Sequence, residues 1–428
     1  MATYNHSVSL NPEKCCGCTH CLKHCPTEAI RIRDRRAVID TSRCIDCGEC
    51  IRVCPHQAKK AVYDKLGDIP KDTYKIALPA PSLFGQFDNL DDIDYVLQGL
   101  LDIGFDDVFE VARAAEIVSD YTRRVISKLK KPVISSACPV IARLLALRYP
   151  LLSDNLLNIL PPVEIAAKMA KEEAKKAHPE LDEKKICTVF VSPCPAKVSY
   201  VKNREAGMES YVDYVVSMSD IYFELLNVMK AGAPVGIPVS RTGMIGLSWA
   251  STGGEATAVF NEKYLAADGI ENVVRVLEEI DNGSFSGLEF VELNACPGGC
   301  VGGVMAVVNP YIAKARLQNL RRYLPVSENH AEEGEGIPKE LEEKAIFDYS
   351  SPTIGKNRAD SLRILLESEE LKKQLPGIDC GSCGSPTCAA FARDVARGNV
   401  DFSECVVFMR EALKNLQKPE GGDKNDRS

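Results

Sequence analysis

Cysteine is the residue type in this 428-residue chain that most clearly indicates chemistry, and 18 cysteines are present. Sixteen of them sort into four sets of four, and four thiolates are what one cubane iron–sulfur cluster requires. Two sets are tandem runs near the N-terminus, one lies near the C-terminus and one is scattered through the middle. The sets are Cys15, Cys18, Cys21 and Cys25; Cys44, Cys47, Cys50 and Cys54; Cys380, Cys383, Cys388 and Cys405; and Cys138, Cys194, Cys296 and Cys300. Cys16 and Cys187 remain outside these sets.

The two N-terminal runs share the spacing C-x2-C-x2-C-x3-C-P, which is typical of bacterial two-cluster ferredoxins. In that pattern the fourth cysteine of each run ligates the other cluster. Zinc is the alternative, but tetrahedral zinc sites use paired C-x2-C units rather than runs of four cysteines. The spacing therefore predicts two cubane clusters with crossed ligands. One cluster would be held by Cys15, Cys18, Cys21 and Cys54, and the other by Cys44, Cys47, Cys50 and Cys25.

The C-terminal set lies in the segment LPGIDCGSCGSPTCAAFARDVARG and ends at Cys405. It resembles the small Fe–S module of electron-transfer and corrinoid iron–sulfur proteins. Glycines between the cysteines allow backbone N–H groups to approach the sulfurs of a cluster. A zinc knuckle is the alternative interpretation.

The overall composition excludes several functional classes. The net charge of −8 gives no reason to expect a nucleic-acid partner, and no apolar run approaches the length of a membrane span. The polar first residues do not resemble a secretion signal. We therefore expect reduced, metal-binding cysteines rather than disulfides, no membrane partner, and an anaerobic cytoplasm as the setting.

Strand patterns lead directly into the scattered cysteines. Apolar, β-branched runs precede Cys138 (131–139), Cys194 (186–197) and Cys296 (288–300). Further strands are predicted at 75–82, at 106–112 and at the start of 211–229. Helices are predicted at 91–104, after the 106–112 strand through residue 129, and over the rest of 211–229. Strands that alternate with helices predict an α/β architecture, in which sites lie just past the strand ends.

These patterns predict a multidomain chain of overall α/β class. We expect a ferredoxin-like α+β domain at 1–65, with two small hairpins and two short helices around its clusters. A main domain would span 72–325, followed by an acidic linker at 326–354. A small, mainly helical Fe–S module would occupy 355–416, with one amphipathic helix and one closing helix. Residues 417–428 would form a disordered tail.

The four middle cysteines, in the order SSACPV, VSPCPAKV and ELNACPGGCVGG behind a two-cluster ferredoxin pattern, resemble the iron–iron hydrogenases over residues 1 to about 320. The resemblance implies a two-lobed α/β hydrogenase domain. It also implies an H-cluster, which is a cubane joined to a diiron unit that carries CO, cyanide and an azadithiolate, in addition to three 4Fe-4S clusters. Cys138, Cys194 and Cys296 would then hold the cubane, and Cys300 would bridge to the diiron unit.

Other segments match the surroundings of that cofactor. Lys197 takes the place of a lysine that binds one cyanide, and a cationic donor suits an anionic ligand. Ala80, Pro81 and Ser82 match a loop that contacts the second cyanide. Two glycine-rich stretches would pack closely on the site: Gly253 and Gly254 in TGGE, and Gly298, Gly299, Gly302 and Gly303 around Cys300.

The resemblance fails at residues that surround the diiron unit. Ala137 stands where the common catalytic enzymes have a proton-relaying cysteine. Tyr200 replaces a glutamate of the usual proton path, and Ser192 and Asn294 replace two methionines. Glu255 and Glu292 adjoin the cofactor loops and are alternative proton carriers in series, although each could equally be a structural cap or an ion-pair partner.

The sequence therefore predicts a hydrogenase of the sensory branch, which interconverts H₂ with protons and electrons slowly. A ferredoxin-like or other redox protein would exchange its electrons, and a signalling protein and a second copy in a homodimer are further partner hypotheses. A hydrogenase-like Fe–S assembly scaffold that carries only cubanes and a pure electron-transfer subunit are the two alternatives.

Overall fold

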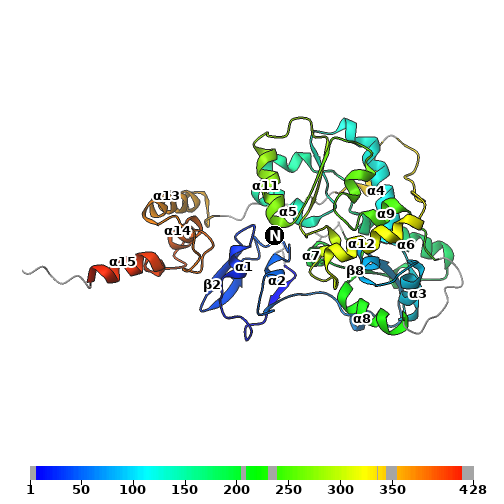
Figure 1. Cartoon of the computed structure of the whole chain (residues 1–428), viewed down its shortest axis with the longest axis horizontal. Helices are drawn as coiled ribbons and strands as arrows, with labels where there is room; N and C mark the ends of the chain where they lie inside the picture. Colours follow the sequence, from blue (N-terminus) through cyan, green and yellow to red (C-terminus); the bar gives the residue numbers. More distant parts are fainter. Residues whose placement is uncertain (1–5, 204–208, 230–238, 335, 344–353, 417–428) are drawn as a thin grey trace, which may run out of the picture.

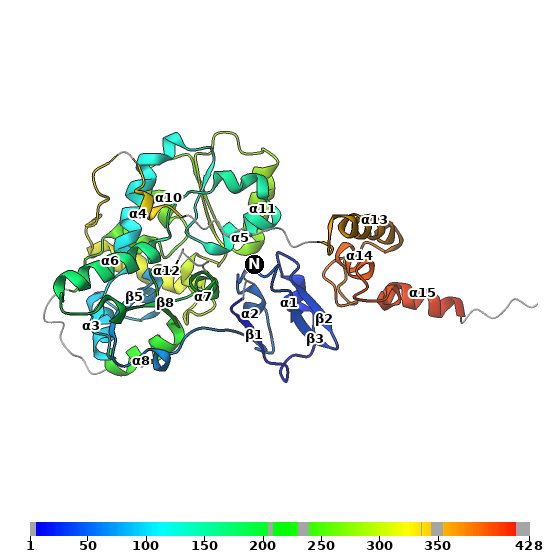
Figure 2. The same ribbon diagram turned by 180° about the vertical axis from the view of Figure 1, so that it is seen from behind.

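The computed structural model describes residues 6–203, 209–229, 239–334, 336–343 and 354–416. Figure 1 shows the N-terminal domain, in blue, between a large cyan, green and yellow body and the orange and red C-terminal helices. Figure 2 shows the same order from behind. The predicted tail at 417–428 and part of the predicted linker, 344–353, lie outside the described residues.

The N-terminal domain consists of two small antiparallel sheets and two one-turn helices. Strands β2 (Ile30–Arg33) and β3 (Arg36–Ile39) form the expected hairpin. The second expected hairpin is wrong, because β1 (Val8–Leu10) pairs with β4 (Lys59–Ala61) from the far end of the domain. The two halves of the domain interleave, so their outer strands meet. Helices α1 (His20–Lys23) and α2 (Glu49–Arg52) each carry a cysteine of one run.

The large domain has two lobes, each built on a parallel sheet. The first sheet has the order β6-β5-β8-β9, and its strands are Asp107–Val108, Tyr74–Pro79, Ile186–Ser192 and Tyr214–Ser217. The second has the order β10-β11-β7, with strands Tyr264–Asp268, Phe290–Asn294 and Val133–Ile134. Separate apolar cores fill the lobes, so the predicted two-lobed α/β fold is confirmed.

Helices cover both sheets, and several of them begin directly at a functional loop. Helices α5 and α7 start with a proline immediately after Cys138 and Cys194, where a missing N–H costs nothing. The helices of this domain are α3 (Asp94–Asp102), α4 (Val111–Val125), α5 (Pro139–Arg148), α6 (Pro162–Ala177), α7 (Pro195–Lys202), α8 (Met218–Met229), α9 (Met244–Ser248), α10 (Gly254–Ala258), α11 (Ile270–Asp281) and α12 (Pro310–Leu320).

Two predicted strands are much shorter than expected. The strand predicted at 106–112 pairs only over Asp107–Val108, because α4 begins at Val111. The strand predicted at 131–139 pairs only over Val133–Ile134, because the chain then turns into the cysteine loop. In both places the apolar residues are buried in loops and helix starts rather than in a longer sheet.

The C-terminal module contains α13 (Arg358–Gln374), α14 (Cys388–Ala396) and α15 (Val406–Leu416). Helices α13 and α15 were expected, whereas α14 was not. It begins at a cysteine, and the hydroxyl of Thr387 caps it by accepting a hydrogen bond from the Ala390 N–H at 3.0 Å.

The first part of the predicted acidic linker lies along α4. The carboxylate of Glu116 accepts backbone N–H groups from Glu328 and Asn329 at 3.0 and 2.9 Å, and Asp120 accepts that of Ala331. This segment is therefore attached to the large domain. Within the described residues, no helix has the length and apolar composition that crossing a bilayer would require.

Candidate functional site

The four middle cysteines meet at one cavity where the carboxyl ends of strands from both lobes converge. Cys138 follows β7, Cys194 follows β8, and Cys296 and Cys300 follow β11. All four line a cavity of about 110 Å³ whose walls are mainly apolar. The sequence separates these residues by up to 162 positions, and the meeting of the two sheets brings them together.

The donor set suits a metal cluster better than a set of free thiols. Burial, together with the charges of neighbouring cysteines, raises the pKa of Cys194 to about 11 and that of Cys300 to about 12. Burial also places the pKa of Cys296 well above its usual range. Because iron binds the thiolate, a cluster would supply the positive charge that four converging sulfurs require, and Cys300 is the most exposed of the four residues. These residues therefore fit the implied cubane.

Lys197 reaches the cavity from the first turn of α7. Its Nζ donates a hydrogen bond to the backbone oxygen of Ala137 at 3.0 Å, and both residues line the cavity. Burial lowers the pKa of Lys197, whereas the thiolates of nearby cysteines act in the opposite sense. An enclosed ammonium of this kind is suited to an anionic ligand such as cyanide.

The loop after β5 supplies another wall. Ala80 and Pro81 line the cavity. Ser82 follows them with 0% of its surface exposed, and its Oγ has no hydrogen-bond partner among the described residues. A buried hydroxyl without a partner is costly, so this position also fits a bound polar group.

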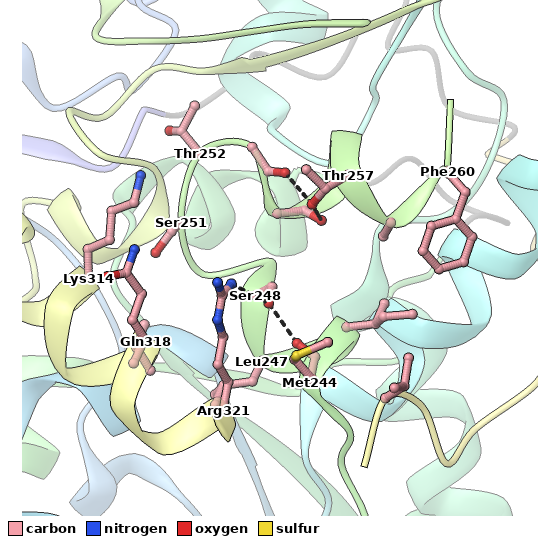
Figure 3. A pocket seen from close by; sticks show the side chains of 16 residues that line it. Met244, Leu247, Ser248, Ser251, Thr252, Thr257, Phe260, Lys314, Gln318 and Arg321 are labelled. Atoms are coloured by element: carbon pink, nitrogen blue, oxygen red, sulfur yellow. Dashed lines mark hydrogen bonds between the residues drawn. The ribbon is translucent and has the colours of Figure 1, made fainter. Parts of the chain in front are cut away.

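The glycines around Cys300 allow loops to approach each other closely. Gly299 has φ +95° and lines the cavity, and a Cβ there would lie 2.6 Å from the Thr252 nitrogen. Gly298 also has positive φ. Gly253 and Gly254 do not line this cavity. They line a different pocket of about 430 Å³, which Ser251, Thr252 and Arg321 also line (Figure 3).

Glu255 and Glu292 both line the cysteine cavity. The Ser135 hydroxyl contacts both carboxylate oxygens of Glu255 at 2.7 and 2.8 Å. Glu292 accepts the N–H groups of Gly253 and Ala256 at 3.0 and 2.8 Å, so it also anchors the start of α10. Burial, followed by the charge of Glu292, raises the pKa of Glu255 to about 8, and burial raises that of Glu292.

Three residues that differ from the family pattern, Asn294, Ser192 and Tyr200, make hydrogen bonds with other parts of the chain. The Asn294 amide donates to Glu292 at 2.7 Å, and the Ser192 hydroxyl accepts the Cys194 N–H at 3.1 Å. The Tyr200 hydroxyl contacts Glu343 of the predicted linker. The contact of Ser135 with Glu255 could not be predicted from the sequence, because a serine at this position belongs to no known ligand or catalytic motif.

The two ferredoxin sets come together in the crossed arrangement that their spacing predicts. One small cavity is lined by Cys15, Cys18, Cys21 and Cys54. A second is lined by Cys25, Cys44, Cys47 and Cys50.

Cys16 borders the first cavity and is exposed. Cys187 lies buried in β8, where burial raises its pKa to about 12, as suits a small apolar residue.

The C-terminal cysteines surround the start of α14. Cys383, Cys388 and Cys405 belong to one apolar cluster around Phe391. Cys380 is exposed. The module therefore exposes Cys380, partly buries Cys383 and Cys388, and buries Cys405.

Family comparisons agree with this geometry. The family described as "Iron only hydrogenase large subunit, C-terminal domain" matches residues 73–233 and 241–304, which together are more than half of the chain. The chain belongs to this family. A 4Fe-4S dicluster domain matches residues 7–55, and an Fe-S cluster family matches residues 375–407. It is therefore an iron–sulfur protein with a hydrogenase-like domain.

Individual relatives are more distant. A corrinoid/iron-sulfur protein large subunit of Moorella thermoacetica is 50% identical over 53 residues, which are 12% of each chain. An uncharacterized protein of Methanocaldococcus jannaschii is 34% identical over 55 residues, 13% of this chain and 25% of that protein. The chain thus spans at most a quarter of the length of these curated relatives.

Solved structures with a similar chain trace are FeFe-hydrogenases. One concerns stepwise H-cluster assembly in HydA, with a TM-score of 0.43, 16% identity, and coverage of 60% of this chain and 86% of that chain. A variant of the Chlamydomonas reinhardtii enzyme has a TM-score of 0.44 and 16% identity, and covers 59% of this chain and 85% of that chain.

Proposed function

We propose that this protein is an iron–iron hydrogenase of the sensory type, which oxidises H₂ or reduces protons slowly. The observation that carries the proposal is the single cavity in which Cys138, Cys194, Cys296 and Cys300 meet beside Lys197. A scaffold for plain cubanes would need the cysteines, but it would not need a buried lysine and an unpaired buried serine beside them.

The residues of the cavity divide the task of holding the cofactor. Cys138, Cys194 and Cys296 would hold the cubane and Cys300 would link it to the diiron unit. Lys197 and Ser82 would donate hydrogen bonds to its anionic ligands. When bound, the diiron unit supplies the metal at which H₂ is split or formed. The mainly apolar walls limit access of water to this position.

Protons need a route that avoids the missing thiol at Ala137. Glu255 and Glu292 lie in the cavity wall, and burial raises the pKa of both. The pKa of Glu255, about 8, allows it to hold a proton near neutral pH. Ser135 connects Glu255 to the backbone beside Ala137, because its Oγ also accepts the Ala137 N–H at 3.2 Å. We infer that the two glutamates carry protons in series.

A slow reaction is compatible with a sensory role. A positioned acid or base contributes about 10²–10⁴ in rate, so loss of the usual relay lowers turnover while the metal ligands remain. The protein would then report H₂ or redox state in an anaerobic cytoplasm through a redox or signalling partner.

Turnover by the loaded protein tests this proposal. Full-length protein that has received the diiron cofactor is assayed for H₂ oxidation with a viologen dye, beside a Cys300→Ser control that removes the thiolate linking the cubane to the diiron unit. We expect slow, H₂-dependent dye reduction that the control lacks. Equal rates in both proteins would refute a hydrogenase function.

A further inference from the structure

The C-terminal module is held against the N-terminal domain by charge pairing with one face of the β2–β3 hairpin. Buried Asp394 of α14 accepts from Arg31 Nε at 2.6 Å and from Arg33 Nη2 at 3.0 Å. Beside it, Arg393 pairs with Glu28 at 2.7 Å. Because a buried carboxylate requires partners, this contact specifies one orientation of the module.

Alternation along β2 places the cluster cavity and the module on opposite faces of one strand. Side chains of neighbouring strand residues point to opposite sides. Arg31 and Arg33 face the module, whereas Ile30 belongs to the core of the N-terminal domain and Ile32 lines the cavity of Cys15, Cys18, Cys21 and Cys54. A single strand therefore separates this cavity from the module.

The cysteine loop of the module is the part that touches this strand. The Ile32 N–H donates to the Gly384 oxygen at 2.8 Å, directly after Cys383. A Cβ at Gly381, directly after Cys380, would lie 3.2 Å from Leu22 beside Cys21, and 3.0 Å from Lys23. The cysteine loop of the module is thus hydrogen-bonded to the strand whose Ile32 lines the cavity of Cys15, Cys18, Cys21 and Cys54.

The opposite end of the N-terminal domain contacts the loop that follows Cys300. Arg52, two residues after Cys50, donates to the Gly302 oxygen at 2.7 Å. A Cβ at Gly48 would meet the Val304 side chain at 2.8 Å. The second ferredoxin cavity therefore faces the Cys300 loop, and Figure 1 shows α2 on the side of the large domain and β2 on the side of α14.

We propose that the C-terminal module carries the outermost cluster of a linear electron-transfer chain, rather than a cluster on a separate branch. An electron from a one-electron donor protein reduces the C-terminal cluster, where Cys380 is exposed. It would then pass to the cluster of the Cys15 cavity, to the cluster of the Cys25 cavity and to the cubane held by the middle cysteines, and each donor cluster would return to its oxidised state. No bond or proton moves. This order rests on the proposed binding of cubane clusters but not on the diiron unit.

The hairpin offers a pair of matched variants. Arg31→Glu with Arg33→Glu places acidic groups against Asp394 and is expected to release the module, while Ile30 and Ile32 keep the domain core. Arg35→Glu with Arg36→Glu makes the same change of net charge at exposed positions of the same hairpin. The proteins are prepared with cubane clusters alone, so the result does not depend on hydrogenase activity.

The first readout is magnetic. In the fully reduced full-length protein, electron paramagnetic resonance should show spin–spin interaction between the C-terminal and first ferredoxin clusters, in addition to that within the ferredoxin pair. We expect the additional interaction to be lost in the Arg31/Arg33 variant and kept in the control. Its absence from the unaltered protein would overturn the proposal even if the variant fails to fold.

The second readout is kinetic. Reduction of the ferredoxin clusters by a reduced ferredoxin-type donor should slow at least tenfold in the Arg31/Arg33 variant and remain unchanged in the control. Reduction by a small dye, which can reach each cluster directly, should not differ. If the donor protein reduces the ferredoxin clusters equally fast in the variant, electrons do not enter through the module.

Discussion

At the scale of residues, Ala137 is the departure with the clearest chemical consequence. It lines the cysteine cavity, and its backbone oxygen holds Lys197. A methyl side chain can neither donate nor accept a proton. Any proton that reaches the cavity must therefore travel through other groups. Glu255 and Glu292 lie at its wall, and the hydroxyl of Ser135 donates a hydrogen bond to Glu255.

Ala137→Cys should raise the rate of H₂ formation by about 10²-fold, because a positioned thiol would restore a proton carrier. The measurement is H₂ evolution from reduced methyl viologen by the loaded protein. Ala137→Ser serves as the control, because it adds comparable bulk with a much weaker acid. A rate that does not rise would show that proton supply at this position is not limiting.

Glu255→Gln should lower H₂ formation by about 10²-fold and change its dependence on pH. The pKa of Glu255 is raised to about 8, so the carboxyl is protonated below that pH and loses its proton as the pH rises through it. The unaltered enzyme should therefore lose H₂ formation near pH 8 more steeply than the variant does.

Glutamine suits this test because its amide can still hydrogen-bond Ser135. Exposed Glu262→Gln is the matched control. Should rate and pH profile stay the same in Glu255→Gln, Glu255 is only a structural group. The effect of Glu292→Gln on H₂ formation would be harder to interpret, because Glu292 also accepts hydrogen bonds from two backbone N–H groups at the start of α10.

At the scale of elements, the loops after β8 and β11 depend on each other. Gly303 has ordinary φ, but a Cβ there would lie 2.2 Å from the Pro193 oxygen, directly before Cys194. Packing this close leaves no room for a methyl group. The distance between Cys194 and Cys300 is therefore set by a glycine that binds nothing itself.

Gly303→Ala should destabilise the protein by about 1–3 kcal/mol and lower the iron bound at the middle cysteines, because overpacking forces the two loops apart. Chemical denaturation and iron quantification measure the two effects. Gly67→Ala is the control, since its added Cβ would meet open space. Equal stability and iron content in both variants would contradict the close contact.

Many of the strands, helices and cysteine loops could be predicted from the sequence, because ligand spacing and strand patterns are local signals. The positions of Cys138, Cys194 and Cys296 just past strand ends follow from apolar runs that stop at a cysteine. The pairing of β1 with β4 could not be predicted, because it depends on how the two halves interleave. Helix α14 was missed because it has only nine residues and directly follows a loop rich in glycine and cysteine.

At the scale of the whole molecule, the order of the domains in space differs from their order in sequence. The module at 355–416 lies against the N-terminal domain, where Arg31 and Arg33 face Asp394. Two arginines on a hairpin strand look like an ordinary solvated face in sequence. Their role requires a partner more than 360 residues away, so no local pattern could reveal it.

Infrared spectroscopy of the loaded full-length protein tests the central claim most directly. CO and cyanide bound to iron absorb where protein does not. The proposed site predicts both sets of bands in the unaltered protein and their loss in Cys300→Ser, which lacks the thiolate that links the cubane to the diiron unit. Absence of these bands from the unaltered protein, beside a normal cubane signal, would contradict the assignment of the middle cysteines to a hydrogenase cofactor.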